Sequence, residues 1–247
     1  MKRMLPLAAA SALLAPLDAF AAHPLVSDDP GTQGNANWQF ELNAEETSKQ
    51  DENGRHQMWN ATLTRGFGER VDLYVNAPYT HLQTRTDESG AGFGDVEIGM
   101  KWRFVERGPL SLALKPMATM PTGNDRRGLG TGRVGTGATL LAQIDVSRFS
   151  FLANAGMTYQ PNRQGDLTAI WAFSGAAIYK ATDTLQIVAD IGTSRNAESG
   201  AGANPAFVIA GAIYSPKPWL DLDIGYRHGL NDQTYRHSVM GGLTVRW

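Results

Sequence analysis

The sequence predicts an all-β fold, a closed antiparallel transmembrane β-barrel of about twelve strands. Apolar and other residues alternate with a period of two in twelve stretches, each close to the length that a tilted membrane strand needs. The connections between these stretches alternate between short and long, as they do in bacterial outer-membrane barrels. No long apolar run follows the N-terminal region, which excludes a helical membrane protein.

The twelve predicted strands account for most of the chain beyond residue 37. They lie near residues 38–45, 58–64, 71–77, 95–104, 110–120, 134–145, 149–160, 167–180, 185–193, 206–214, 219–227 and 236–247. The short connections, near 66–70, 105–109, 146–148, 181–184 and 215–218, are expected in the periplasm. The long ones, near 48–54, 80–94, 121–133, 161–166, 194–205 and 228–235, are expected outside the cell.

The first 22 residues have the pattern of a cleavable secretory signal. Lys2 and Arg3 precede an apolar, alanine-rich stretch, and small residues follow at 19–22. A short buried helix is the alternative, but two prolines and Asp18 within 6–18 argue against it. We therefore expect residues 1–22 to be a signal peptide, cleaved after Ala21 or Ala22, and residues 23–247 to form a barrel in the outer membrane of a Gram-negative bacterium.

Composition excludes several classes of partner and chemistry. The 247 residues carry 22 Lys and Arg against 24 Asp and Glu, with no basic block, so nucleic acid is not an expected partner. The absence of cysteine excludes disulfides, thiolate zinc sites and cysteine nucleophiles. The five histidines show no spacing typical of a metal site. We expect no metal and no cofactor.

Alternation also assigns the two faces of the wall. Leu73, Ile98, Leu112 and Leu222 are predicted to face lipid, whereas the neighbouring Tyr74 and Gly99 are predicted to face inward. Aromatic residues fall near strand ends, as in the girdles of membrane barrels. The terminal Trp247 resembles the signature by which the barrel assembly machinery recognises outer-membrane proteins. Outer-membrane lipid and that machinery are therefore the expected partners.

The predicted inward face is polar and charged. Twelve strands should enclose a narrow lumen whose lining decides what passes. The lumen-lining candidates are Glu41, Glu45, Asp72, Asp95, Glu97, Lys101, Arg103, Lys115, Asp190, Asp221, Asp223, Arg227, Arg236 and Arg246. They could select a permeant or form paired charges that only stiffen the barrel, and the sequence leaves both roles open.

The charges on three neighbouring strands give a more specific expectation. Asp72 should fall opposite Lys101 to Arg103, and Lys115 should lie beside Gly99, near Glu97. Two cross-strand pairs of opposite charge would follow.

Two short motifs suggest chemistry and are better explained by the barrel. Residues 130–135 match G-x-G-x-x-G, but a period-two stretch rather than a helix follows, which indicates a loop entering a strand. His237 and Ser238 could suggest a hydrolase acting on lipid. Successive strand residues point to opposite faces, so these two cannot form a dyad with each other. We expect no catalytic residue.

Three segments, taken in order, resemble a known family. They are Gly66 to Leu73 running to Pro78-Tyr79, Gly92 to Asp95 continuing through Gly99 to Arg103, and Pro121-Thr122-Gly123 followed by Gly128 to Gly132. This pattern resembles the outer-membrane barrel family assigned to transport in the meta-cleavage pathway of phenol degradation. Trp102 stands where another aromatic, commonly tyrosine, is expected.

The resemblance implies a barrel that admits small molecules, aromatic or hydrophobic compounds among them, and it brings no catalytic residues. The sequence therefore predicts a passive outer-membrane channel with a narrow polar lumen. Two alternatives stay open: a membrane-embedded hydrolase of lipids, and a non-conducting barrel used for structure or adhesion.

Overall fold

The computed structural model describes residues 23–48, 55–83, 90–163, 165–198, 200–234 and 236–247. These residues form thirteen strands and one short 3-10 helix, η1 (Asp125–Arg127), and none of their helices has the length and hydropathy of a membrane span. The strands are β1 (Trp38–Ser48), β2 (Arg55–Phe67), β3 (Val71–Gln83), β4 (Gly90–Phe93), β5 (Val96–Arg107), β6 (Leu110–Met120), β7 (Gly135–Val146), β8 (Phe149–Tyr159), β9 (Ala169–Lys180), β10 (Leu185–Ser194), β11 (Ala206–Lys217), β12 (Leu220–Gly229) and β13 (His237–Arg246).

Twelve of the strands close into an antiparallel barrel, which confirms the predicted fold. Each pairs with its neighbours in sequence, and β1 pairs with both β2 and β13, which closes the ring. The short β4 is an addition, paired with the outer part of β3 from Tyr79 to Leu82. The expectation of an irregular connection over 80–94 was therefore wrong at both ends, because β3 continues to Gln83 and four residues of β4 extend its hairpin.

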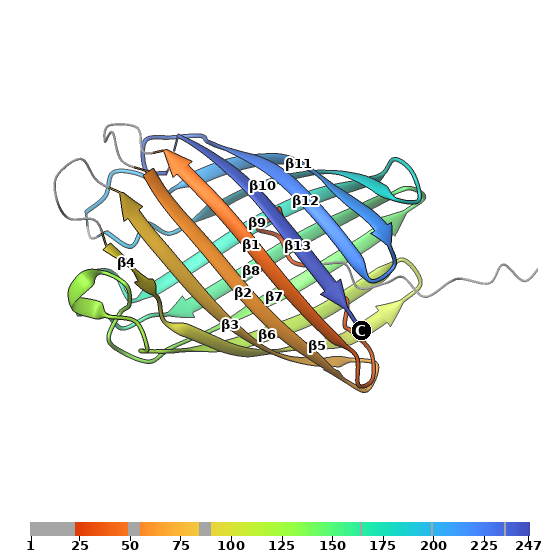
Figure 1. Cartoon of the computed structure of the whole chain (residues 1–247), viewed down its shortest axis with the longest axis horizontal. Coiled ribbons are helices and arrows are strands. Elements are labelled where there is room, and N and C mark those ends of the chain that lie inside the picture. The colour runs from red at the N-terminus through yellow and green to blue at the C-terminus, as the bar shows by residue number, and fades with distance from the viewer. Residues whose placement is uncertain (1–22, 49–54, 84–89, 164, 199, 235) are drawn as a thin grey trace, which may run out of the picture.

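The two ends of the barrel differ as the connection lengths predict. The tight turns gather at one end, together with the C-terminus, and the longer connections gather at the other (Figure 1). At the tight-turn end the rings of Trp38 and Trp247 stack with centroids 6.4 Å apart. At the other end the centroids of Trp59 and Tyr79 lie 5.9 Å apart. Aromatic rings at both ends are typical of the girdles that flank the lipid-facing band.

The outer face is apolar because side chains alternate along every strand. Leu73 and Ile98 are each 45% exposed and Leu222 is 43% exposed. Leu112 faces the same side, paired across the sheet with Ala142. Such exposure on a closed barrel is explained by contact with lipid.

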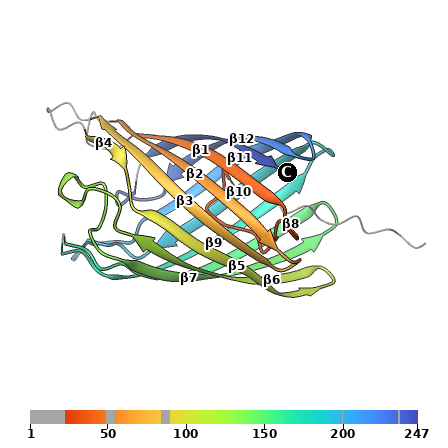
Figure 2. The same cartoon turned by 60° about the horizontal axis from the view of Figure 1, so that its bottom comes forward.

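Residues 23–37, which we call the N-terminal segment, lie inside the barrel rather than along its wall. The segment forms no strand, and its side chains and backbone contact inward-facing residues of β3, β5, β6, β9, β10 and β12. In Figure 2, part of its red trace is visible among the strands before it joins β1. The alternation along the strands does not predict this placement, and the segment determines the character of the lumen.

Candidate functional site

Wall carboxylates hold the first part of the N-terminal segment. His23 Nδ1 lies 2.5 Å from Asp223 Oδ1 on β12. The backbone N–H groups of Val26 and Ser27 both donate to Asp190 Oδ2 on β10, at 2.7 Å. Asp190 is 3% exposed, and it is satisfied by these two backbone donors and the Ser27 hydroxyl rather than by a cation. Two predicted lumen residues, Asp190 and Asp223, therefore contact the segment directly.

Asp28 is the centre of the charge cluster. Its two carboxylate oxygens lie 2.9 Å from Lys101 Nζ and 2.7 Å from Lys115 Nζ. Burial alone would raise the pKa of Asp28, but the two ammonium groups outweigh it and hold that pKa well below its usual range. Asp28 is therefore ionised at neutral pH and joins the segment to β5 and β6.

In place of the two predicted charge pairs on these strands, Lys101 and Lys115 both form ion pairs with Asp28. Asp72 is opposite Lys101, as expected, but the ion pair of Lys101 is with Asp28. Lys115 was expected beside Gly99, and this was wrong. Gly99 pairs with Met117 because β5 runs to Arg107, beyond the predicted strand end at 104, and the bulge near Arg103 offsets only part of the resulting shift.

The last part of the segment is held at the tight-turn end. The N–H of Gln33 donates to the Asp72 carboxylate, 3.1 Å from both oxygens, and the hydroxyl of Thr32 donates to the Glu69 carbonyl at 2.9 Å. Asp72, 2% exposed, thus contacts the segment as Asp190 does. The segment then leaves the lumen beside Gly66 and begins β1.

One side of the lumen is apolar, which corrects the expectation of a polar lining throughout. Leu25 of the segment packs with buried side chains of β8 to β11, namely Leu152, Ala176, Val188 and Ile213. Burying a leucine in this way stabilises the seated segment by about 1.5 to 3 kcal/mol. Alternation identifies which residues point inward, but it does not require them to be polar where another segment covers them.

Inward-facing glycines make room for the start of the segment. A Cβ at Gly225 would lie 2.6 Å from Pro24 Cβ, and one at Gly211 would lie 2.7 Å from Pro24 Cγ. A Cβ at Gly242 would lie 2.7 Å from His23 Nδ1. These three strand positions lack side chains where the segment rests on the wall.

The glycines that face Pro24 and His23 give a prediction. Gly225→Val should displace Pro24 and lower the free energy that holds the N-terminal segment in the lumen by about 1 to 3 kcal/mol, the usual cost of overpacking. Limited proteolysis of the detergent-solubilised barrel should then cut within residues 23–37 faster than in the wild type. Gly241→Val is the matched control, because a Cβ there would meet nothing closer than 3.6 Å. Equal cleavage of both variants would contradict the proposed role of Gly225.

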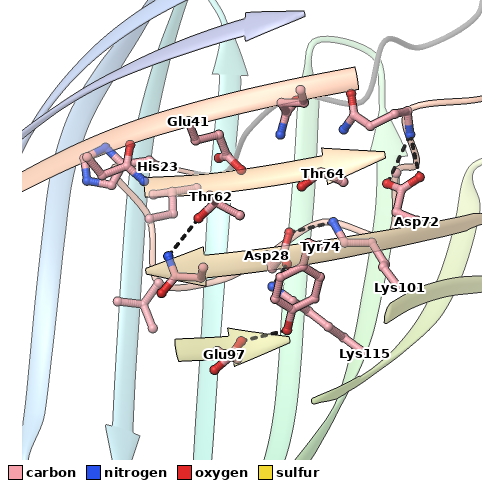
Figure 3. A pocket seen from close by; sticks show the side chains of 17 residues that line it. His23, Asp28, Glu41, Thr62, Thr64, Asp72, Tyr74, Glu97, Lys101 and Lys115 are labelled. Carbon is pink, nitrogen blue, oxygen red and sulfur yellow. Dashed lines mark hydrogen bonds and ion pairs between the residues drawn. The ribbon is translucent and has the colours of Figure 1, made fainter. Parts of the chain in front are cut away.

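A cavity of about 240 Å³ remains between the segment and the wall (Figure 3). Tyr74 lies in it, and its hydroxyl donates to Glu97 at 2.7 Å. The Asn76 amide donates to the Thr62 hydroxyl at 2.8 Å. The lining from the wall is mainly polar and comprises Gln39, Glu41, Asn43, Thr62, Thr64, Asp72, Tyr74, Asn76, Glu97, Lys101 and Lys115.

Other predicted lumen residues form ion pairs away from this cavity. Arg227 Nη1 lies 2.9 Å from Glu45 Oε1, and Arg246 Nη2 lies 2.7 Å from Asp221 Oδ2. These pairs join neighbouring parts of the wall and fit the stiffening role. Arg103 donates to the Glu69 carbonyl at 2.8 Å, near the tight-turn end.

Two predicted lumen residues lie elsewhere. Asp95 is between β4 and β5 and accepts hydrogen bonds from the N–H groups of Gly123 and Thr131, so it ties together the long loops at the barrel mouth. Arg236 is exposed in the connection before β13. Both assignments extended the alternation beyond the end of a regular strand, where it no longer determines whether a side chain points inward or outward.

The two chemical motifs have structural explanations. Ser238 faces inward and is 1% exposed, whereas His237 contacts the lipid-side residues Tyr226 and His228. The two therefore lie on opposite faces of β13. Residues 130–134 form a loop into β7, and Thr131 is bound to Asp95. Among the described residues, no three histidines and carboxylates are grouped as a metal site.

The model of one protein family matches residues 27–247, nearly the whole described chain. Its description reads "Putative MetA-pathway of phenol degradation". The chain belongs to this family. The sequence resemblance is thereby confirmed, and the match includes most of the N-terminal segment. No curated protein matches the chain.

Solved structures of the same fold are outer-membrane channels and porins. An outer membrane channel from Pseudomonas putida F1 superposes with a TM-score of 0.73 at 11% identity, over 89% of this chain and 98% of that one. The NanC porin gives a TM-score of 0.59 at 9% identity, over 83% and 98% of the two chains. The KdgM porin gives 0.57 at 7% identity, over 84% and 98%. At such identities the likeness shows the fold, and this member of the family has the closed β-barrel fold of outer-membrane channels.

Proposed function

We propose that this barrel is a passive outer-membrane channel for small molecules and that the N-terminal segment must shift before solutes pass. The observation that carries the proposal is that the wall closes without the segment, which lies in the lumen, adds no strand to the wall and is held by ion pairs, hydrogen bonds and the packing of Leu25. A conduction path is therefore present whenever the segment moves. Family membership and the channel fold support the same function.

The permeants that suit this lumen combine an apolar body with a polar group. The apolar wall around Leu152 and Val188 faces the segment on one side, and the polar cavity around Tyr74 lies on the other. Small aromatic compounds have both kinds of surface. The family description, which names phenol degradation, is consistent with this class.

Conductance of the purified protein in planar bilayers tests the proposal. We expect discrete openings separated by long closed periods, because the segment is bound inside the lumen most of the time. Deleting residues 24–33 should remove the closed periods and raise the mean current. A deletion variant that is folded, as shown by a heat-dependent shift on gels, and still does not conduct would favour a non-conducting structural barrel. The observation that favours this second candidate, the non-conducting barrel, is the presence of the N-terminal segment inside the lumen.

The mature protein should begin at His23. Cleavage after Ala22 would make His23 the N-terminal residue, so that a free α-ammonium group belongs to the same residue whose ring lies against the Asp223 carboxylate. We therefore propose removal of residues 1–22, with assembly guided by the exposed Trp247 at the end of β13. The intact mass of protein purified from outer membranes checks the cleavage site. A mass that includes Ala22 would place the cut one residue earlier, and recovery from the soluble periplasm would contradict the proposed location.

A further inference from the structure

One carboxylate of the N-terminal segment occupies a two-lysine site on the wall. Each oxygen of Asp28 contacts a different ammonium group, at 2.9 Å to Lys101 and 2.7 Å to Lys115. We propose that Lys101 and Lys115 form the binding site for the carboxylate of a small aromatic permeant, and that Asp28 fills this site as an internal substitute. The inference rests on the proposed channel function and names the class of solute that releases the segment.

The two lysines need an anion between them. They lie on adjacent strands, between the register pairs Gly99↔Met117 and Trp102↔Leu114, so both side chains project into the lumen at the same height. Two like charges at opposed positions of a sheet repel each other. Distances of 2.7 and 2.9 Å are those of charge-assisted hydrogen bonds, and a carboxylate that binds both ammonium groups removes the repulsion.

The anion now in the site can be exchanged. Asp28 belongs to a segment that adds no strand to the wall, and the strands that carry the two lysines pair with each other independently of it. A tethered group competes with an effective concentration on the order of millimolar. A free carboxylate at about that concentration should therefore displace Asp28 and loosen the segment.

Tyr74 supplies an aromatic surface next to the lysines. Its ring centroid lies 4.8 Å from Lys115 Nζ, and the ring covers Gly99, where any side chain would collide with it. The hydrogen bond to Glu97 fixes the ring in this orientation. A ring attached to the bound carboxylate can stack on Tyr74.

Carboxylates elsewhere in the cavity limit the charge of the ligand. Glu41, Asp72 and Glu97 line the same space, so a second anionic group on the ligand would be repelled. The site therefore suits a monocarboxylate with an aromatic ring better than a dicarboxylate.

Binding of 4-fluorobenzoate to the detergent-solubilised barrel, followed by fluorine NMR, tests the site directly. Asp28→Asn removes the competing charge with little change of shape, so we expect the affinity for 4-fluorobenzoate to rise at least tenfold over the wild type. Adding Lys101→Met and Lys115→Met to Asp28→Asn should abolish the gain. The neutral probe 4-fluorobenzyl alcohol should bind all three proteins alike.

Asp29→Asn is the matched control. Asp29 is the next residue and is buried, and its carboxylate accepts a hydrogen bond from the Gly31 N–H at 2.6 Å, whereas the ion pairs of the two lysines are with Asp28. A gain in Asp29→Asn equal to that in Asp28→Asn would overturn the inference, as would a gain that survives loss of both lysines. A heat-dependent gel shift shows that each variant is folded.

The bilayer measurement keeps this inference separate from the proposed function. Binding of 4-fluorobenzoate by a folded barrel that never conducts would overturn the channel and leave the carboxylate site standing. If the barrel conducts but Asp28→Asn does not raise its affinity for 4-fluorobenzoate, the carboxylate site is overturned and the channel stands.

Discussion

Replacing Ser27 and Ser174 by cysteine is expected to close the channel under oxidising conditions and to reopen it on reduction. Ser27 belongs to the N-terminal segment and Ser174 to β9, and their hydroxyl oxygens are 2.8 Å apart. A disulfide needs sulfur atoms about 2.0 Å apart, which a small adjustment of these side chains provides. The chain contains no cysteine, so no other disulfide can form.

The expected result follows from the position of the cross-link. Ser27 is fully buried between the segment and the wall, so a bond there keeps the whole segment from leaving. Current in planar bilayers should fall to the leak level in the oxidised protein and recover after treatment with dithiothreitol. Each single cysteine variant is a control, since it changes the same side chains without a cross-link. Unchanged current in a protein shown by mass spectrometry to be fully oxidised would mean that solutes pass a segment that stays seated.

The wall of the barrel was predictable from sequence because its signal is local. Alternation along a strand depends only on neighbouring residues, and it placed Leu73, Ile98 and Leu222 correctly on the outside. The alternation could not predict side-chain contacts that form only when the barrel closes. The pair of Arg227 with Glu45 joins β12 and β1 across the intervening β13, and the two residues are 182 positions apart in the chain.

The N-terminal segment was missed because it has no period to detect. Its position depends on contacts with strands throughout the chain, and residues 23–37 look like a polar linker when taken alone. Two features did carry a signal. Gly211, Gly225 and Gly242 are small residues at inward positions on adjacent strands, which suggests that something else fills the space. The acidic pair Asp28-Asp29 is the second signal, because carboxylates in a segment next to the barrel can pair with lysines on its inner face.

Replacing an outward leucine by arginine is the second large effect. Leu63→Arg on β2 should lower the free energy of unfolding by about 2 to 4 kcal/mol, because the charge is forced into the lipid-facing band. Leu63 is 36% exposed on the outer face, and it pairs with Val75 of β3. Urea titration of refolding into lipid vesicles measures the change.

The adjacent Thr62 gives a sharper control than the inward position Gly99, where the Tyr74 ring leaves no room for a side chain. Thr62 lines the cavity together with Glu41 and Glu97, so Thr62→Arg places its guanidinium among carboxylates rather than in lipid. Its only evident loss is the hydrogen bond from Asn76. We therefore expect Thr62→Arg to cost less than Leu63→Arg by about 2 kcal/mol, the difference between a lipid-facing and a lumen-facing charge. Equal costs at the two neighbouring positions would show that β2 does not present Leu63 to lipid, and the assigned inside and outside of the whole wall would fail with it.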